Sequence, residues 1–155
     1  MSSTYTQIHI HAIIVVQNRT SIIYNSWQDE LYKYIIGIIK GNNHKPIIIN
    51  GMPDHLHILF GMRPAQSLSE LMQSIKFNSS KWINERKFIR SHFSWQEGYG
   101  AFSCGKSELQ KVINYISNQK EHHKKKNFIE EYHEFLKAFN IDYDERYIFK
   151  AVENN

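Results

Sequence analysis

The turn between two apolar runs in the first half of the chain constrains the fold most strongly. Residues 45–50 (KPIIIN) and 55–61 (HLHILFG) are short and rich in β-branched and apolar residues, which is typical of strands. Gly51-Met52-Pro53-Asp54 lies between them, and these residue types favour turns. The sequence therefore predicts two strands in succession, with no helix between them.

The segments on either side extend this pattern. A strand is predicted at 8–16 (IHIHAIIVV) and a helix at 26–40, and a second helix begins near Ser67, where Ser67-Leu68-Ser69-Glu70 has capping-box spacing. A strand at 99–103 and a helix beyond Gly105 follow. The first six elements match an α+β fold, the ferredoxin-like sandwich with an antiparallel sheet (split βαβ). We predict that this domain covers residues 1–126 and is followed by C-terminal helices. Residues 127–155 are predicted to form a helical extension that packs on the same domain, because 128–139 carries apolar residues at helical spacing.

Length and composition limit the class of protein. A chain of 155 residues is long enough for one well-cored domain and too short for two comfortable ones. It lacks an apolar run of the about 18 residues needed to span a membrane, and its N-terminus does not resemble a secretory signal. The single cysteine, Cys104, excludes an internal disulfide framework. We expect a soluble protein of the bacterial cytoplasm or nucleoid, with no membrane partner.

Two residue pairs suggest chemistry. Tyr115 and Gln119 are four residues apart in a predicted helix, and His55 and His57 are two apart in a predicted strand, so each pair shares one face of its element. Two imidazoles and an amide oxygen could hold a metal ion beside the phenol, an arrangement suited to phosphoryl transfer. Each signal is weak alone: His9-Ile10-His11 has the same histidine spacing, and a tyrosine in an apolar stripe is packed more often than catalytic. We expect His9 and His11 to lie beside the site or in the core without coordinating.

Three motifs together resemble one family. Pro53-Asp54-His55-Leu56-His57, residues 98–103 (GYGAFS) and residues 115–119 (YISNQ) look like the signature of the HUH single-tyrosine transposases, which comprise the insertion-sequence single-strand DNA transposases and the REP-associated tyrosine transposases. The resemblance covers nearly the whole chain, as far as residues 144–147. It implies that His55 and His57 are the metal-binding pair, Gln119 the third metal ligand and Tyr115 the nucleophile. It also implies a single-stranded DNA substrate with an imperfect palindromic hairpin.

The chemistry can be checked against these residue types. A tyrosine with a pKa of about 10 needs a nearby cation and an activated phosphate to attack at neutral pH. Mg²⁺ or Mn²⁺ would supply both, and Mn²⁺ suits imidazole better. Attack by Tyr115 would leave a 5′-phosphotyrosine and a free 3′-hydroxyl, so that a second strand could be joined without ATP.

Basic residues suggest where DNA binds. The formal charge is +4, which alone is modest support for a polyanionic partner. Single strands need a basic groove and aromatic stacking surfaces. The predicted DNA contacts are Arg19, Lys76, Lys81, Trp82, Arg86, Lys124, Lys125 and Lys126.

Two other functions share these features. A replication-initiator-type nicking endonuclease would use the same chemistry, but the chain is small and has no helicase-like segment. A domesticated hairpin-binding module would keep the fold and lack turnover, and the intact ligands and nucleophile argue against it. The resemblance leaves the oligomeric state open, because insertion-sequence members are dimers in which the tyrosine helix can serve the partner's site, whereas REP-associated members can act as monomers.

Overall fold

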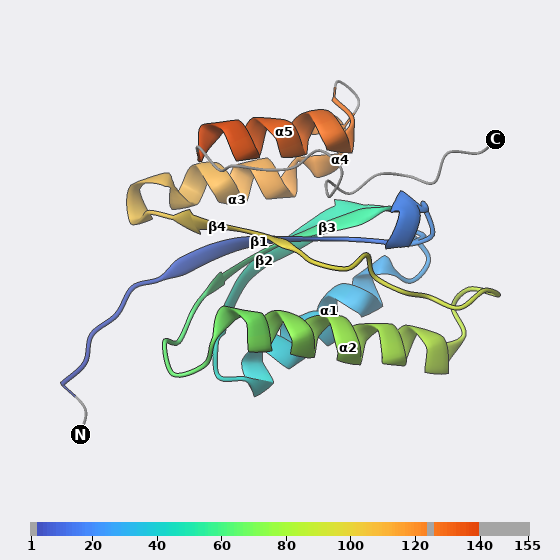
Figure 1. The fold of residues 1–155 in the computed structure, drawn as a ribbon, viewed down its shortest axis with the longest axis horizontal. Coiled ribbons are helices and arrows are strands. Elements are labelled where there is room, and N and C mark those ends of the chain that lie inside the picture. Colours follow the sequence, from blue (N-terminus) through green and yellow to red (C-terminus); the bar gives the residue numbers. More distant parts are fainter. Residues whose placement is uncertain (1–2, 124–125, 140–155) are drawn as a thin grey trace.

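The computed structural model describes residues 3–123 and 126–139 (Figure 1). Four strands and two long helices alternate as the sequence predicts, and shorter helices follow the last strand. In chain order the elements are β1 (His9–Val15), the 3-10 helix η1 (Gln17–Arg19), α1 (Gln28–Gly41), β2 (Lys45–Met52), β3 (His55–Gly61), α2 (Leu68–Arg86), β4 (Gly100–Cys104), the 3-10 helix η2 (Lys106–Glu108), α3 (Leu109–Ser117), α4 (Gln119–His122) and α5 (Phe128–Ala138).

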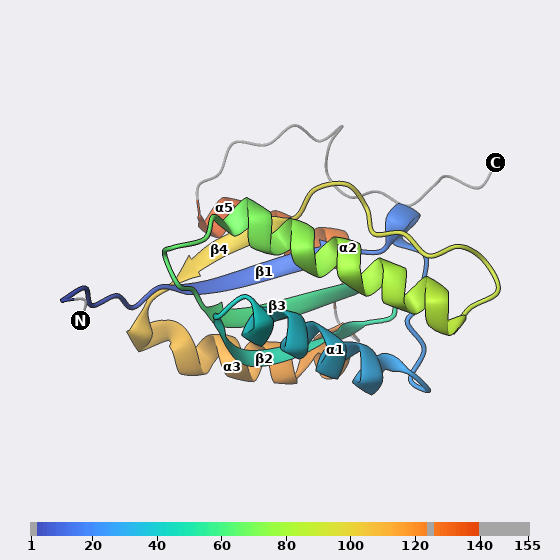
Figure 2. The same ribbon diagram turned by 90° about the horizontal axis from the view of Figure 1, so that it is seen from below.

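The strands form one sheet in the order β2-β3-β1-β4, and every neighbouring pair is antiparallel (Figure 2). The pairing register sets Val15 of β1 against His55 of β3, and His9 against Gly61. This order places β1 and β3 in the centre and leaves β2 and β4 at the edges. The ferredoxin-like fold and its antiparallel sheet are therefore confirmed.

One face of the sheet packs against α1 and α2 (Figure 1). Ser67 caps α2 as predicted, because its side-chain oxygen accepts a hydrogen bond from the backbone N–H of Glu70 at 3.1 Å. Alternate residues of β1 and β3 supply the sheet side of this core, and two helical stripes supply the other side. Its fully buried members include Ala12, Ile14, Leu31, Ile35, Ile39, Leu56, Ile58, Phe60, Leu71 and Ile75.

The opposite face of the sheet is covered by α3, α4 and α5, so the molecule has three layers (Figure 1). The other set of alternate residues in β1, with Phe102 of β4, packs against Phe128, Tyr132 and Leu136 of α5. The predicted C-terminal helix therefore docks on the body of the protein. The division into 1–126 and 127–155 stays a prediction, since residues 140–155 lie outside the described residues.

Helices on both faces explain the sequence of the central strands. β1 and β3 are buried on both sides, and this is why they read as continuous apolar runs and not as alternating ones. His11, His55 and His57 of these strands are buried, whereas His9, at the start of β1, is half-buried. Among the described residues, no helix combines the length and the apolar character needed to cross a membrane.

Candidate active site

β3 begins with two histidines whose side chains point toward the layer formed by α3, α4 and α5. Because successive strand residues face opposite sides of a sheet, His55 and His57 share this face while Leu56 enters the core against α1 and α2. Both histidines have 0% exposure, and their ring centroids lie 5.2 Å apart. The strand therefore presents two imidazoles to one enclosed volume.

Each of these imidazoles is held through its Nδ1 atom. Nδ1 of His55 lies 2.7 Å from Oδ1 of Asp54, and Nδ1 of His57 lies 2.8 Å from Nε2 of His11. His11 is therefore beside the site, touching it through His57, as expected. Burial lowers the pKa of His57 to about 4 and that of His11 to about 3, so both rings are neutral near pH 7. Neutral imidazole is the form that binds metals.

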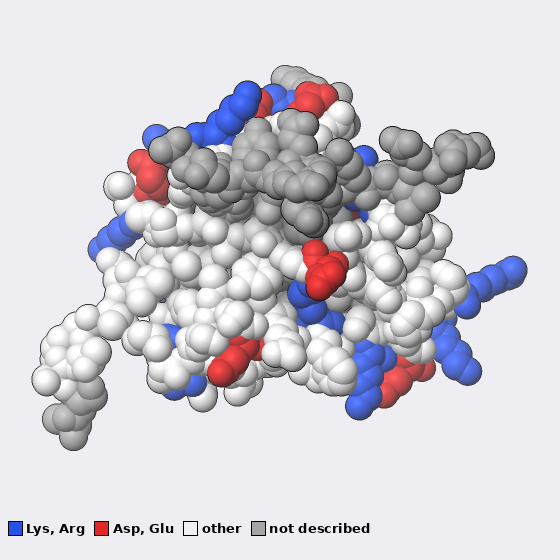
Figure 3. Space-filling model, viewed as in Figure 1, with Lys and Arg blue, Asp and Glu red and all other residues white. Residues whose placement is uncertain are grey.

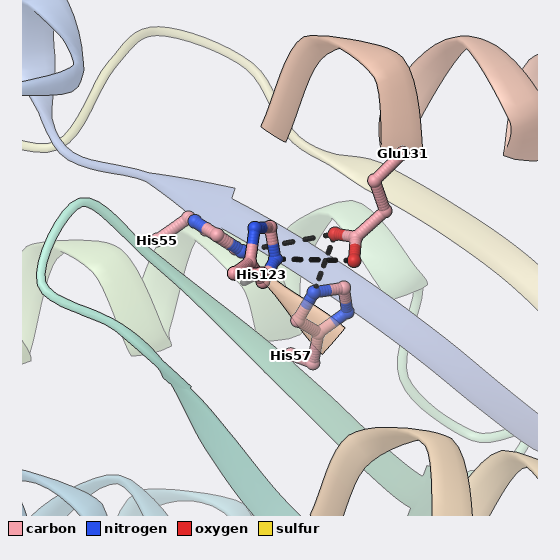
Figure 4. A group of neighbouring side chains, drawn as sticks. All are labelled: His55, His57, His123 and Glu131. Carbon is pink, nitrogen blue, oxygen red and sulfur yellow. Dashed lines mark hydrogen bonds and ion pairs between the residues drawn. The ribbon is translucent and has the colours of Figure 1, made fainter. Parts of the chain in front are cut away.

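A carboxylate from α5 meets the free sides of these rings (Figure 4). Oε1 of Glu131 lies 2.9 Å from Nε2 of His57 and 3.7 Å from Nε2 of His55, and Oε2 lies 3.2 Å from Nε2 of His123. One ligand atom from each of these four residues can be chosen so that all four atoms lie within 4.8 Å of one another. Burial alone would raise the pKa of Glu131, but hydrogen bonds from His123 and His57 outweigh it and hold that pKa far below its usual range. The carboxylate is therefore ionised.

Tyr115 and Gln119 reach the same carboxylate. The Tyr115 hydroxyl donates a hydrogen bond to Oε2 of Glu131, and its ring centroid lies 5.7 Å from that of His57. Gln119 is fully buried, with its Nε2 3.5 Å from Oε2 of Glu131 and its Oε1 3.1 Å from Nε2 of His123. Burial and the nearby carboxylate both raise the pKa of Tyr115, so the phenol carries its proton. The structure thus brings all four residues singled out by the sequence into one cluster.

The predicted tyrosine helix is divided into α3 and α4 at Asn118. Nδ2 of Asn50, from edge strand β2, donates to the carbonyls of Ile116 at 3.0 Å and Ser117 at 3.3 Å. In a continuous helix each carbonyl accepts from the N–H group four residues later, and its second lone pair can accept another donor. A contact from a distant strand therefore meets the chain where α3 ends, and Gln119 begins a new short helix that still faces the cluster.

The cluster fits a divalent metal ion. Nε2 of His55 is buried and has no hydrogen-bond partner, which is costly unless some other group satisfies it. Imidazole nitrogens with a carboxylate oxygen suit Mn²⁺ or a similar divalent ion, and two histidines with one carboxylate leave positions open for substrate. The residues that could hold such an ion are His55, His57, His123 and Glu131. Gln119 contacts two of them, Glu131 and His123.

Sequence reasoning missed His123 and Glu131. Glu131 lies three residues after Phe128 and four before Phe135, on the apolar stripe of α5, and it is 1% exposed. A carboxylate on an apolar helix face is the signal that marks it, because a buried charge needs a partner. His123 follows Gln119 by four residues, the spacing that places two side chains on one helix face.

Most of the predicted DNA contacts do not join this cluster. Lys76, Lys81, Trp82 and Arg86 all belong to α2, which covers the other face of the sheet (Figure 1). The ammonium of Lys76 donates to the carbonyls of Gln96 and Gly98 at 2.7 and 2.8 Å, so it ties down the segment that leads to β4. The α2 side chains therefore lie across the sheet from Tyr115 and do not contribute to the cluster.

Within α2 these residues divide between two surfaces. Lys76 and Lys81 line an open groove of about 1030 Å³ between α2 and residues 92–99, together with Phe77, whose side chain is 65% exposed. The Trp82 ring instead stacks on Tyr34 with centroids 4.6 Å apart. Arg86 pairs with Glu30 at 3.2 Å and lies over Trp82. The groove keeps an aromatic side chain available for stacking, whereas Trp82 already has one face covered.

The other predicted DNA contacts follow β1 or precede α5. Arg19 ends η1, which leaves β1 at the end of the sheet where Val15 pairs with His55. Lys126 pairs with Glu134 of α5. Lys124 and Lys125 lie outside the described residues. In Figure 3, Lys and Arg side chains are interspersed with acidic ones and form no continuous basic field on the face in view.

Comparisons with known proteins agree with this architecture. The model of the "Transposase IS200 like" family matches residues 4–119. The ISDra2 transposase TnpA of Deinococcus radiodurans is 21% identical over 118 residues, which cover 73% of this chain and 84% of that protein. A candidate transposase from Deinococcus radiodurans R1 has a similar crystal structure, with a TM-score of 0.63 and 18% identity over 77% of this chain and 95% of the other.

A REP-associated tyrosine transposase bound to a REP hairpin is also similar, with a TM-score of 0.60 and 14% identity over 79% of this chain and 73% of the other. At these identities the two solved structures show a shared fold. The family model spans well over half of the chain and ends at Gln119, the last residue of the tyrosine motif. The chain therefore belongs to the IS200-like transposase family.

Proposed function

We propose that this transposase cleaves and rejoins single-stranded hairpin DNA through a 5′-phosphotyrosine formed on Tyr115, with a divalent metal ion held by His55 and His57. The observation that carries the proposal is the position of the Tyr115 hydroxyl. It donates to the same carboxylate whose other oxygen lies 2.9 Å from Nε2 of His57. The nucleophile and the metal donors therefore belong to one cluster.

The chain's own residues account for the steps of the reaction. The Tyr115 oxygen attacks the scissile phosphorus and forms a P–O bond, and its proton passes to solvent. The bond from phosphorus to the 3′ oxygen breaks, and that oxygen takes a proton from solvent. The ion, when bound, polarises the phosphate and favours the phenolate through its charge. Attack by a free 3′-hydroxyl on the phosphotyrosine reverses these steps and joins a strand.

The enclosure of the cluster supports this chemistry. His55, His57 and Gln119 have 0% exposure and Glu131 has 1%. In such a setting charges interact more strongly than in water, so a bound cation would lower the pKa of the Tyr115 phenol and oppose the nearby carboxylate, which raises it. The neutral state of His57 also leaves its ring free to act as a ligand.

The nature of the DNA partner rests on the family and on one neighbour. The REP-associated relative of similar fold is described bound to a REP hairpin, and we extend hairpin binding to this chain. The α2 groove with Lys81 and Phe77 is the surface we propose for a single-stranded segment. Whether two chains associate, and a location in the bacterial cytoplasm or nucleoid, stay predictions.

The test is the formation of a covalent adduct. A labelled single-stranded hairpin library is incubated with the protein and Mn²⁺, and denaturing gels detect DNA attached to protein. We expect an adduct with the wild type and with Tyr24→Phe, which alters a tyrosine half exposed at 50%, but none with Tyr115→Phe or with a chelator. An adduct that persists in Tyr115→Phe, or none under any condition, would overturn the proposal. A binding module without turnover would retain the hairpin regardless of metal and form no adduct.

A further inference from the structure

The two oxygens of the Glu131 carboxylate face different groups. Oε1 lies toward the strand histidines, 2.9 Å from Nε2 of His57 and 3.7 Å from Nε2 of His55. Oε2 lies toward the helices, where it accepts from the Tyr115 hydroxyl and from Nε2 of His123. One side chain therefore touches both the proposed metal pair and the proposed nucleophile.

The distances around Oε1 match those between ligands of one ion. Ligand atoms about 2.1 Å from a metal lie roughly 3.0 to 3.4 Å apart in octahedral or tetrahedral geometry. The two distances from Oε1 to the Nε2 atoms of His57 and His55, 2.9 and 3.7 Å, lie on either side of this range. Little side-chain movement is needed to place an ion among them, and the unpartnered Nε2 of His55 would gain a bond.

Gln119 is placed differently. Its amide nitrogen lies 3.5 Å from Oε2 of Glu131, and its amide oxygen lies 3.1 Å from His123. These contacts hold the carboxylate through Oε2, the oxygen that faces the helices. Groups that orient a ligand in this way change metal affinity without binding the metal themselves.

We propose that Glu131 supplies the anionic oxygen ligand that joins His55 and His57, and that Gln119 is the residue that positions it. This inference rests on the proposed function and names a ligand of the same site. Glu131 lies beyond the segment that the family model matches, which ends at residue 119. The C-terminal helix α5 is thus part of the metal centre, and its removal would remove a ligand.

Metal binding without DNA tests the assignment. Mn²⁺ is titrated calorimetrically into the wild type, Glu131→Gln, Gln119→Ala and the control Glu130→Gln, which removes the same charge from an exposed position on the same helix. Loss of an orienting residue costs about 10- to 100-fold in metal affinity. We therefore expect Gln119→Ala to weaken binding within that range, Glu131→Gln to weaken it by roughly 100-fold or more, and Glu130→Gln to bind like the wild type.

Each outcome decides between the proposals. If the wild type does not bind Mn²⁺, the metal-dependent function itself fails. If it binds and Glu131→Gln binds equally well, the ligand assignment alone is wrong. Binding abolished by Gln119→Ala and retained by Glu131→Gln would return the ligand role to Gln119.

A second measurement covers the case in which Glu131→Gln does not fold. Mn²⁺ should slow amide hydrogen exchange in α5 of the wild type and leave α2, on the other face of the sheet, unchanged. Glu131→Asp keeps the charge but shortens the arm, and it should show weaker Mn²⁺ binding and less protection of α5. Unchanged binding in Glu131→Asp, together with no effect of Mn²⁺ on α5 exchange, would overturn the ligand role.

Discussion

Asp54→Asn should weaken metal binding although Asp54 does not face the metal donors. Its Oδ1 lies 2.7 Å from Nδ1 of His55, on the side of the ring opposite Nε2. Burial raises the pKa of Asp54, but the hydrogen bond to His55 more than offsets this and the pKa is lowered, so the group is a carboxylate. A carboxylate accepts only, which fixes the proton of His55 on Nδ1 and leaves Nε2 as an acceptor for a metal.

The size of the effect follows from this contact. Asparagine has nearly the same shape but can donate as well as accept, so the preference for one tautomer of His55 is lost. A hydrogen bond to a charged group contributes about 1.5–3 kcal/mol when buried. The Asp54 side chain is 21% exposed, and solvent reduces that figure. We expect Mn²⁺ affinity to fall roughly 10- to 100-fold, or about 1.4–2.7 kcal/mol.

Calorimetric titration with Mn²⁺ measures this directly, with circular dichroism to check that the fold is kept. Asp29→Asn is the matched control, because it removes the same charge from an exposed position in the first turn of α1, across the sheet from the cluster. His55→Ala sets the scale for complete loss of a ligand. If His55→Ala loses binding and Asp54→Asn keeps wild-type affinity, orientation of His55 by Asp54 has no role and the reasoning is refuted.

Three further predictions concern whether Tyr115 acts with the histidines of its own chain, the α2 groove and the core. All cluster residues come from one chain, so a mixture of Tyr115→Phe and His57→Ala should form no covalent DNA adduct; adduct formation in the mixture would show that the tyrosine acts in a partner's site. Phe77→Ala should weaken single-stranded DNA binding by about 1–3 kcal/mol in fluorescence anisotropy titrations and leave Mn²⁺ affinity unchanged, and equal DNA affinity would exclude the groove. Ser79→Ala removes the acceptor 2.9 Å from the buried Trp95 Nε1, so thermal unfolding should show a loss of about 1–3 kcal/mol; an unchanged melting temperature would mean that the indole N–H finds another partner.

Much of the fold could be predicted from the sequence. Alternation of strand and helix patterns and the Ser67 cap are local signals, and the element order admits few sheet topologies. The turn predicted at 51–54 is narrower in the structure, because β2 continues through Met52 and only Pro53 and Asp54 form the turn. The boundaries agree to within a residue or two for the central strands and for α5. The break at Asn118 was not predicted, and the β2 amide that contacts the carbonyl of Ile116 beside it is distant in sequence.

The candidate site was predictable only in part. The histidine pair, the tyrosine and the glutamine have periodic spacing that places each pair on one face. Glu131 comes from a helix whose apolar spacing predicted docking but not which strand it would meet. The four basic or aromatic candidates on α2 were chosen for their residue types and their clustering in the sequence. Neither property indicates which face of the sheet α2 covers, and the structure places α2 across the sheet from the cluster.

By itself the sequence determined which residues share a face, since the repeats of strand and helix are properties of the local backbone. It thereby specified a pair of imidazoles, a phenol and an amide as side chains able to converge. Only the tertiary structure decided that they converge on Glu131, that His11 and Asp54 orient the two rings, and that α2 faces away. The physical reason is that burial between the sheet and α5 depends on long-range packing, and burial is what makes a carboxylate among histidines a candidate site for an ion.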